Sequence, residues 1–192
     1  IFNVTGWSNY SIGEGATNLL TQCQNLTLEN TTYTLMNNVS TNETCFYILA
    51  NNVTLDCQNW NNRIVYGNQN NETFYLGVYS EKDNPIVKNC EITKGSAALL
   101  TQQRGGIYFP IVSNGIITNV NVSNNLFGIY LDFGSNNSLT GITANDNALY
   151  GIYLALNSNN NNITSITANN NHYGIYLDSS SNNNLINITT NN

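Results

Sequence analysis

The feature that most constrains this chain is a short phrase that recurs at a nearly constant interval. Gly-Ile-Tyr, followed by Phe or Leu, begins at Gly106, Gly128, Gly151 and Gly174, at spacings of 22, 23 and 23 residues. A fainter copy, GVYS, begins at Gly77. A chain that repeats at a fixed period of this length stacks one structural unit on the next, so the sequence predicts a solenoid.

A second phrase accompanies the first in every interval. It contains two aliphatic columns, which are Ile117, Leu139, Ile163 and Leu185, and then Val120, Ile142, Ile166 and Ile188. Both phrases alternate apolar and polar residues and are rich in Ile, Val, Thr and Tyr, which is typical of strands. Asn, Ser and Gly separate them and indicate turns, and they interrupt every window that could form a helix. Leucine-rich repeats have a similar period, but their L-x-x-L-x-L-x-x-N frame is missing.

The GIYL phrases and their NxIT partners resemble the right-handed parallel β-helix repeat family, which includes pectate-lyase-like proteins, NosD-type proteins and archaeal surface proteins. The resemblance is clear over 106–192 and looser over 46–105. It implies an all-β, right-handed parallel β-helix, a solenoid with coils of about 22–24 residues. Residues 1–44 fit the repeat poorly and are expected to form an N-terminal cap or joining segment with an irregular first coil. The regular β-helix is then expected over 45–192, with a loop insertion near 95–105.

Stacked coils would place equivalent residues about 4.8 Å apart in columns. Ile129, Ile152 and Ile175 are expected to form an inward column, with Leu131, Leu154 and Leu177 beside it. The 41 Asn residues are expected mainly at corners, because Asn tolerates the left-handed backbone conformation and stacked Asn side chains can hydrogen-bond along a column. We therefore interpret the Asn tracts as ordered turns rather than disordered segments.

The four cysteines favour disulfides in an oxidising compartment. There is no C-x-x-C motif, and a single histidine cannot complete ordinary zinc spacing. Three pairings are possible. Stacking favours Cys23 with Cys45, which are one coil apart, and Cys57 with Cys90, which occupy similar points of VTLDCQ and IVKNCEI.

Composition excludes some partners and favours export. The formal net charge is −6, and the five Lys and Arg residues are not clustered as nucleic-acid binding requires. No apolar run approaches the roughly 20 residues of a membrane span. Ile1 opens the chain without Met or a basic segment, so we expect a processed or trimmed chain. Twelve positions fit N-x-S/T and are candidate glycosylation sites: Asn3, Asn9, Asn25, Asn30, Asn38, Asn42, Asn52, Asn71, Asn121, Asn136, Asn162 and Asn187.

Catalytic constellations are hard to find in this sequence. The resemblance implies clustered Asp with an Arg or Lys base in lyases, or paired Asp with a His motif in hydrolases. Asp132 and Asp178 share one repeat position, but Ala155 stands between them. They would be roughly 9.6 Å apart, and we interpret them as solvated carboxylates. His172 lies in a turn and is expected to be exposed, so no catalytic residue, metal or cofactor is predicted.

The most specific surface signal is aromatic. Tyr108, Tyr130, Tyr153 and Tyr176 share an outward column, with Tyr79 as a candidate first member. The column has three interpretations: cross-coil stacking alone, a protein contact that includes self-assembly, or stacking against sugars. A second column precedes each repeated Gly and could lie inside or at a corner, and it consists of Phe127, Tyr150 and Tyr173.

Together these patterns predict a non-catalytic, secreted, N-glycosylated cell-surface protein that self-assembles as a surface layer, stalk or filament subunit. The sequence ends in NITTNN directly after a strand phrase, so the last coil is expected to continue or to dock end to end or by an edge on another subunit. The alternative is a carbohydrate-binding adhesin, or a diverged polysaccharide lyase or hydrolase.

Overall fold

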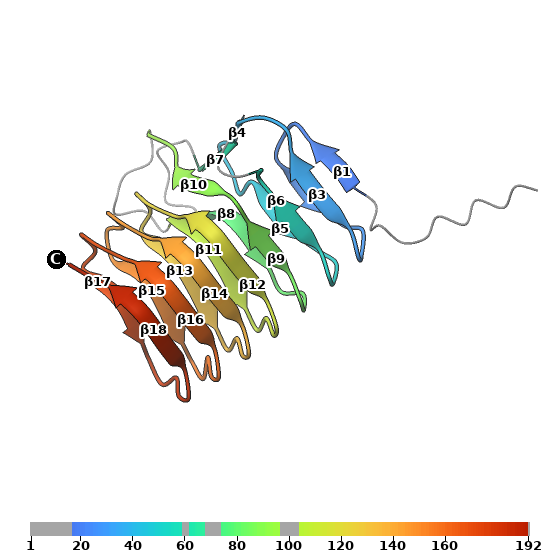
Figure 1. The fold of residues 1–192 in the computed structure, drawn as a ribbon. Helices are drawn as coiled ribbons and strands as arrows, with labels where there is room; N and C mark the ends of the chain where they lie inside the picture. The colour runs from blue at the N-terminus through green and yellow to red at the C-terminus, as the bar shows by residue number, and fades with distance from the viewer. Residues whose placement is uncertain (1–16, 59–61, 68–73, 97–103, 192) are drawn as a thin grey trace, which may run out of the picture.

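The structure, a computed structural model, describes residues 17–58, 62–67, 74–96 and 104–191. Within these ranges all regular elements are strands, in two parallel sheets (Figure 1). Sheet A contains β1 (Thr17–Leu20), β3 (Thr32–Leu35), β4 (Val39–Ser40), β6 (Thr54–Asp56), β7 (Arg63–Tyr66), β9 (Ile86–Lys88), β10 (Glu91–Lys94), β12 (Ile116–Asn121), β14 (Ser138–Thr143), β16 (Asn162–Thr167) and β18 (Asn184–Thr189). Sheet B contains β2 (Gln24–Leu26), β5 (Phe46–Ile48), β8 (Tyr75–Ser80), β11 (Arg104–Pro110), β13 (Phe127–Asp132), β15 (Tyr150–Ala155) and β17 (Tyr173–Leu177).

Each circuit of the chain passes through one strand of sheet B and through one or two strands of sheet A, and so forms one coil of a solenoid. In sheet B the spatial order is β17-β15-β13-β11-β8-β5-β2, and all pairs of neighbouring strands in the described parts of both sheets are parallel. β4, β7 and β10 form a branch that joins sheet A at β12. Figure 1 shows the coils stacked in chain order, as a right-handed parallel β-helix requires. The described residues contain no helix that is long and apolar enough to cross a membrane.

The hydrophobic core lies between the sheets and follows the predicted columns. Ile129, Ile152, Leu131 and Leu154 are fully buried and in register from strand to strand. Removing such a side chain from water contributes roughly 1.5–3 kcal/mol. Leu177 continues the leucine column but is 37% exposed, because β17 is the outermost described strand of sheet B. The alternation that the sequence shows therefore corresponds to an inside and an outside of the coil.

Asparagines form the bends, as the sequence predicts. Among the described residues, twenty that are not glycine have positive φ and thirteen of these are Asn, so most left-handed bends there use the side chain that tolerates them best. One bend column is joined by amide hydrogen bonds. Asn52 donates to Asn30 at 3.0 Å and Asn84 donates to Asn52 at 2.9 Å. The described Asn tracts are thus part of the ordered fold.

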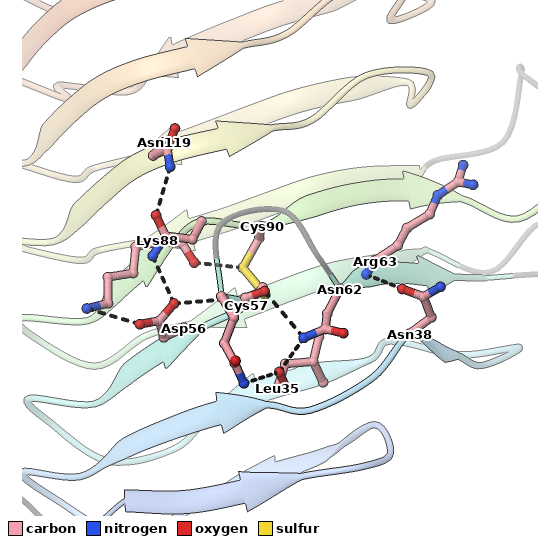
Figure 2. The surroundings of a disulfide bond; sticks show 11 residues. Leu35, Asn38, Asp56, Cys57, Asn62, Arg63, Lys88, Cys90 and Asn119 are labelled. Carbon is pink, nitrogen blue, oxygen red and sulfur yellow. Dashed lines mark hydrogen bonds and ion pairs between the residues drawn. A yellow bond between two sulfur atoms is a disulfide. The ribbon is translucent and has the colours of Figure 1, made fainter.

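Two disulfides link neighbouring coils. Cys23 is bonded to Cys45 and Cys57 to Cys90, which is the pairing that the repeat favours. Figure 2 shows Cys57–Cys90 with the Asp56–Lys88 ion pair beside it, at 3.2 Å. Asn89 also donates to Asp56 at 2.9 Å. These contacts hold the pKa of Asp56 below its usual value, although burial acts in the opposite direction as the largest single effect.

The regular coils begin earlier than the expected boundary at residue 45. β1 pairs with β3 in register from Thr17, and β2 pairs with β5, so 17–44 already contribute stacked coils rather than an irregular one. Parallel pairing uses backbone groups, so these strands need no GIYL phrase to join the sheets. Residues 1–16 of the expected cap or joining segment lie outside the described residues. The expected loop near 95–105 lies mostly outside them too, since 97–103 are not described and β11 begins at Arg104.

The glycines of the repeated phrase allow close contact between coils. A Cβ at Gly151 would lie 2.4 Å from the carbonyl oxygen of Gly174 and 2.9 Å from Ala168 Cβ. Gly151→Ala should therefore lower the free energy of unfolding by about 2 kcal/mol or more, because backbone would have to shift. Denaturant unfolding monitored by circular dichroism measures this effect.

Gly141 supplies the matched control for that substitution. Its φ is +65°, and the nearest atom to an added Cβ is 3.7 Å away, so Gly141→Asn should leave stability unchanged or raise it. Equal losses in the two variants would contradict the assignment of Gly151 to close coil contact.

Candidate functional site

The outer face of sheet B carries a continuous column of tyrosines, here called the tyrosine ladder. Each strand of sheet B from β5 to β17 contributes one tyrosine, and each tyrosine is in register with the next: Tyr47, Tyr79, Tyr108, Tyr130, Tyr153 and Tyr176. Buried residues flank every member from Tyr47 to Tyr153, as Ile129 and Leu131 flank Tyr130, whereas the neighbours of Tyr176 in the outermost described strand are partly exposed. The period of two along each strand thus turns the tyrosines outward, as the sequence predicts.

The three central ladder rings, Tyr108, Tyr130 and Tyr153, stack with nearly parallel planes, whereas the other neighbouring ladder rings meet edge-on or tilted. Tyr108 and Tyr130 have centroids 4.7 Å apart with planes 17° from parallel, and Tyr130 and Tyr153 are 4.8 Å apart at 14°. Rings this close and nearly parallel must overlap as offset stacks, because side-by-side rings in one plane would collide. Both faces of Tyr130 are therefore covered, and mainly ring edges and hydroxyls point to solvent.

A second aromatic column packs beside the ladder on the same outer face. Tyr150 lies 6.0 Å from Phe127 and 5.4 Å from Tyr173 between ring centroids, and 4.6 Å from Tyr153 of the ladder. The sequence predicts that this column lies inside the coil or at a corner. It lies outside because two successive buried residues, Gly128 and Ile129 in β13, interrupt the alternation. The two columns form one aromatic surface, and His172 adds an exposed ring against Tyr173 at 4.5 Å.

Carboxylates accept hydrogen bonds from the ladder hydroxyls along one side. The Tyr79 hydroxyl donates to Glu81, the Tyr108 hydroxyl to Asp132 at 3.3 Å, and the Tyr153 hydroxyl to Asp178 at 3.4 Å. These acids occur on alternate coils. Pro110 and Ala155 occupy the register positions on either side of Asp132.

Burial and negative charge raise the pKa of four ladder phenols, those of Tyr79, Tyr108, Tyr130 and Tyr153. Burial, followed by the charge of Asp132, raises the pKa of Tyr108 to about 12, and burial raises the pKa of Tyr130 further. Burial also raises the pKa of Asp132, while hydrogen bonds from Tyr108 and Tyr130 oppose that change. At neutral pH the ladder therefore presents hydrogen-bond donors beside separated acceptors.

The ladder hydroxyls and their separated carboxylates suit binding to another molecule better than acid–base catalysis. Carboxylates two coils apart are separated by roughly 9.6 Å, which is at or beyond the ~6.5–9.5 Å span of an inverting pair. Two basic groups are already engaged on sheet A, since Arg63 pairs with Glu91 at 3.2 Å and Lys88 pairs with Asp56. In the part of the chain that the structure describes, no three His, Cys, Asp or Glu residues gather as a metal site.

Most candidate glycosylation sites lie on the surface. Among the described sites, the side chain of Asn121 is half-buried and accepts a hydrogen bond from Ser123 at 2.6 Å. The others are exposed: Asn25, Asn30, Asn38, Asn42, Asn52, Asn136, Asn162 and Asn187. Asn3, Asn9 and Asn71 lie outside the described residues. Attachment of glycans at any of these positions stays a prediction.

Sequence reasoning missed two members of the site. Tyr47 begins the ladder, and it lies between buried Phe46 and Ile48 in the same alternation as the GIYL phrases. Glu81 follows Tyr79 by two residues, the offset at which Asp132 follows Tyr130 and Asp178 follows Tyr176. Both signals were present in the sequence, but they lie before the clear repeat, where the coil length varies.

The raised pKa of Tyr108 predicts sensitivity to alkali. The unfolded chain ionises first, near the ordinary value of 10.0, so the stabilisation is complete below that pH and is lost as pH rises towards about 12. Tyr108→Phe removes this group and should lose less stability than the natural protein over that interval. Denaturant unfolding across the interval measures the difference.

The same pair of proteins provides its own reference between neutral pH and pH 10, above the acid range in which Asp132 titrates, because there the difference in stability should not vary with pH. Stability curves that run parallel through the alkaline range would contradict the raised pKa.

Comparisons with known proteins agree with this architecture. Residues 61–192 match the family model described as "Right handed beta helix region". A sequence search of curated proteins finds no match. Among solved structures, the fold is similar to that of a periplasmic alginate epimerase, with a TM-score of 0.57 and 19% sequence identity. The match covers 81% of this chain and 34% of that one, so this chain spans about a third of its neighbour's length, and the likeness concerns the fold.

Proposed function

Because this chain belongs to the right-handed β-helix family, we propose that it is a non-catalytic, exported structural protein of the cell surface that assembles end to end. The observation that carries the proposal is the covered state of the ladder rings, with Tyr108–Tyr130 and Tyr130–Tyr153 stacked at 4.7 and 4.8 Å. Sugars pack against exposed ring faces. A ladder whose central rings already cover one another supports a rigid scaffold more than a sugar platform.

The C-terminal coil supports assembly through its core residues. Leu177 and Leu185 are 37% and 39% exposed, whereas their register partners Leu154 and Ile163 are fully buried. The outer edges of β17 and β18 also offer backbone groups for parallel pairing. A further coil, from the same chain or from a second copy, would bury these leucines, and our proposal predicts that a second copy can supply it. Head-to-tail contacts of this kind produce filaments when they do not close.

Leu185→Lys should therefore prevent association, because it places a charge where a second copy would bury an apolar side chain. Sedimentation velocity over a range of concentrations, together with electron microscopy of the natural protein, measures assembly. Ile186→Lys is the matched control. It lies on the same strand and is 46% exposed, but its register partner Thr164 faces outward, so assembly should persist.

Two results would contradict this function. A monomer at every concentration would show that the same chain or another partner covers the last coil. Turnover of alginate that Asp132→Asn abolishes would instead favour the carbohydrate-active alternative, towards which the fold of the neighbouring epimerase points.

We also propose that the protein is N-glycosylated outside the cytoplasm, which its two disulfides support. Mass spectrometry of chymotryptic peptides from the natural protein should find glycans on exposed sites such as Asn25 and Asn136. Asn121 should be modified least, because it ends β12 with a half-buried side chain. Modification of Asn121 with all exposed sites vacant would contradict this ranking.

A further inference from the structure

One bend column departs from the chemistry of the other bends. Positive φ recurs at four places in the later coils, and three of these columns consist of Asn, Asp, Ser or Gly, such as Asn136, Asn160 and Asn170. The fourth follows the strands of sheet B. It contains Ile111, Phe133 and Leu156 on three successive coils, with φ of 53°, 51° and 49°. We call these three residues the apolar ridge.

The apolar ridge is unfavourable for folding in two respects. A left-handed backbone is costly for residues with a large side chain, most of all for β-branched Ile. The three side chains are also exposed, at 59%, 51% and 44%. In its described ranges the same chain uses Asn at thirteen positive-φ positions, so a relaxed alternative is common there. Strained residues that expose apolar surface are typical of binding sites.

The apolar ridge adjoins the tyrosine ladder. Each ridge residue comes three positions after a ladder member, as Phe133 follows Tyr130, and directly after the strand that carries it. Backbone bonds keep the ridge in register: Ile111 N donates to Asp132 O at 2.6 Å, and Phe133 N donates to Ala155 O at 3.3 Å. Coils about 4.8 Å apart make the three side chains one continuous strip.

The charges around the apolar ridge are mainly negative. Asp132 directly precedes Phe133, and Asp178 lies one coil beyond Ala155. The turn after β8 contributes three more charges, which are Glu81, Lys82 and Asp83. Four carboxylates and one ammonium therefore flank the strip.

We propose that the apolar ridge and its carboxylates form a docking site for a protein segment that is both basic and apolar. Charge complementarity selects this occupant. A second copy of the chain fits poorly, because the whole chain has five Lys and Arg residues against eleven Asp and Glu, and Arg63 and Lys88 are paired on sheet A. This proposal does not depend on end-to-end assembly, which uses the C-terminal coil.

Replacement of ridge residues by Asn separates binding from folding. The double variant Ile111→Asn with Leu156→Asn removes apolar surface and relaxes two strained bends. It should be produced in a host without N-linked glycosylation, since both changes create N-x-S sites. The thermal midpoint should rise by about 2–4 °C, while affinity for a synthetic peptide of alternating Lys and Leu should fall at least about tenfold.

Two single variants test the loss of apolar surface and the change in backbone strain separately. Ser179→Asn lies in the same bend column at φ 51° and removes no apolar surface, so it should bind the peptide as the natural protein does. Asn160→Leu places an exposed leucine at another left-handed bend, so it should lower the midpoint without strengthening binding. A peptide of alternating Glu and Leu should not bind the natural protein. Fluorescence anisotropy with labelled peptides measures all of these affinities.

Several outcomes would overturn the proposal. Unchanged peptide affinity in the double variant would show that binding depends on charge alone. A lower midpoint would show that the apolar ridge stabilises the fold by its own packing. Loss of self-association in the double variant would assign the surface to a second copy, and binding to neutral phosphatidylcholine vesicles would assign it to a membrane.

Discussion

Parallel backbone pairing between successive coils is the interaction on which the rest of the structure depends. Each strand donates to and accepts from the coils above and below, so equivalent residues lie one above another at a fixed spacing of about 4.8 Å. The stacked Gly151 and Gly174 show how close this approach is, since a Cβ at Gly151 would lie 2.4 Å from the carbonyl oxygen of Gly174. Columns of like residues follow from that spacing: aliphatic columns inside, Asn ladders at the bends and tyrosines on sheet B.

Stacking in columns also explains why sheet B carries both the stacked tyrosines and the strained apolar residues. On sheet A, charged side chains form ordinary ion pairs such as Arg63–Glu91. On sheet B, the stacking of Tyr108 on Tyr130 recurs between Tyr130 and Tyr153, and the unfavourable placement of a large apolar residue such as Phe133 at positive φ recurs on three successive coils. A repeated cost of this kind distinguishes the apolar ridge from the Asn bends, where the repeated residue matches the backbone that it occupies.

Much of the fold could be predicted because the repeat encodes it directly. The inward Ile129 and Leu131, the outward Tyr130, the Asn bends and the pairing of Cys23 with Cys45 are all consequences of stacking units of about 22 residues. The prediction was weaker before residue 106, where coil lengths vary and strands shorten to a few residues. Tyr47 and the coils of 17–44 were missed there, because backbone pairing does not require similar side chains.

The sequence by itself determined that this chain forms a solenoid of short strands with an apolar interior, asparagine-rich bends and an outward tyrosine column, because period-two alternation within a fixed repeat has one stacked solution. The tertiary structure alone decided which ring faces are covered, that Tyr150 lies outside, and that Ile111, Phe133 and Leu156 share one strained, exposed strip. These properties depend on ring planes, on interruptions of the alternation and on the sign of φ. None of them follows from the order of residues until the coils are stacked.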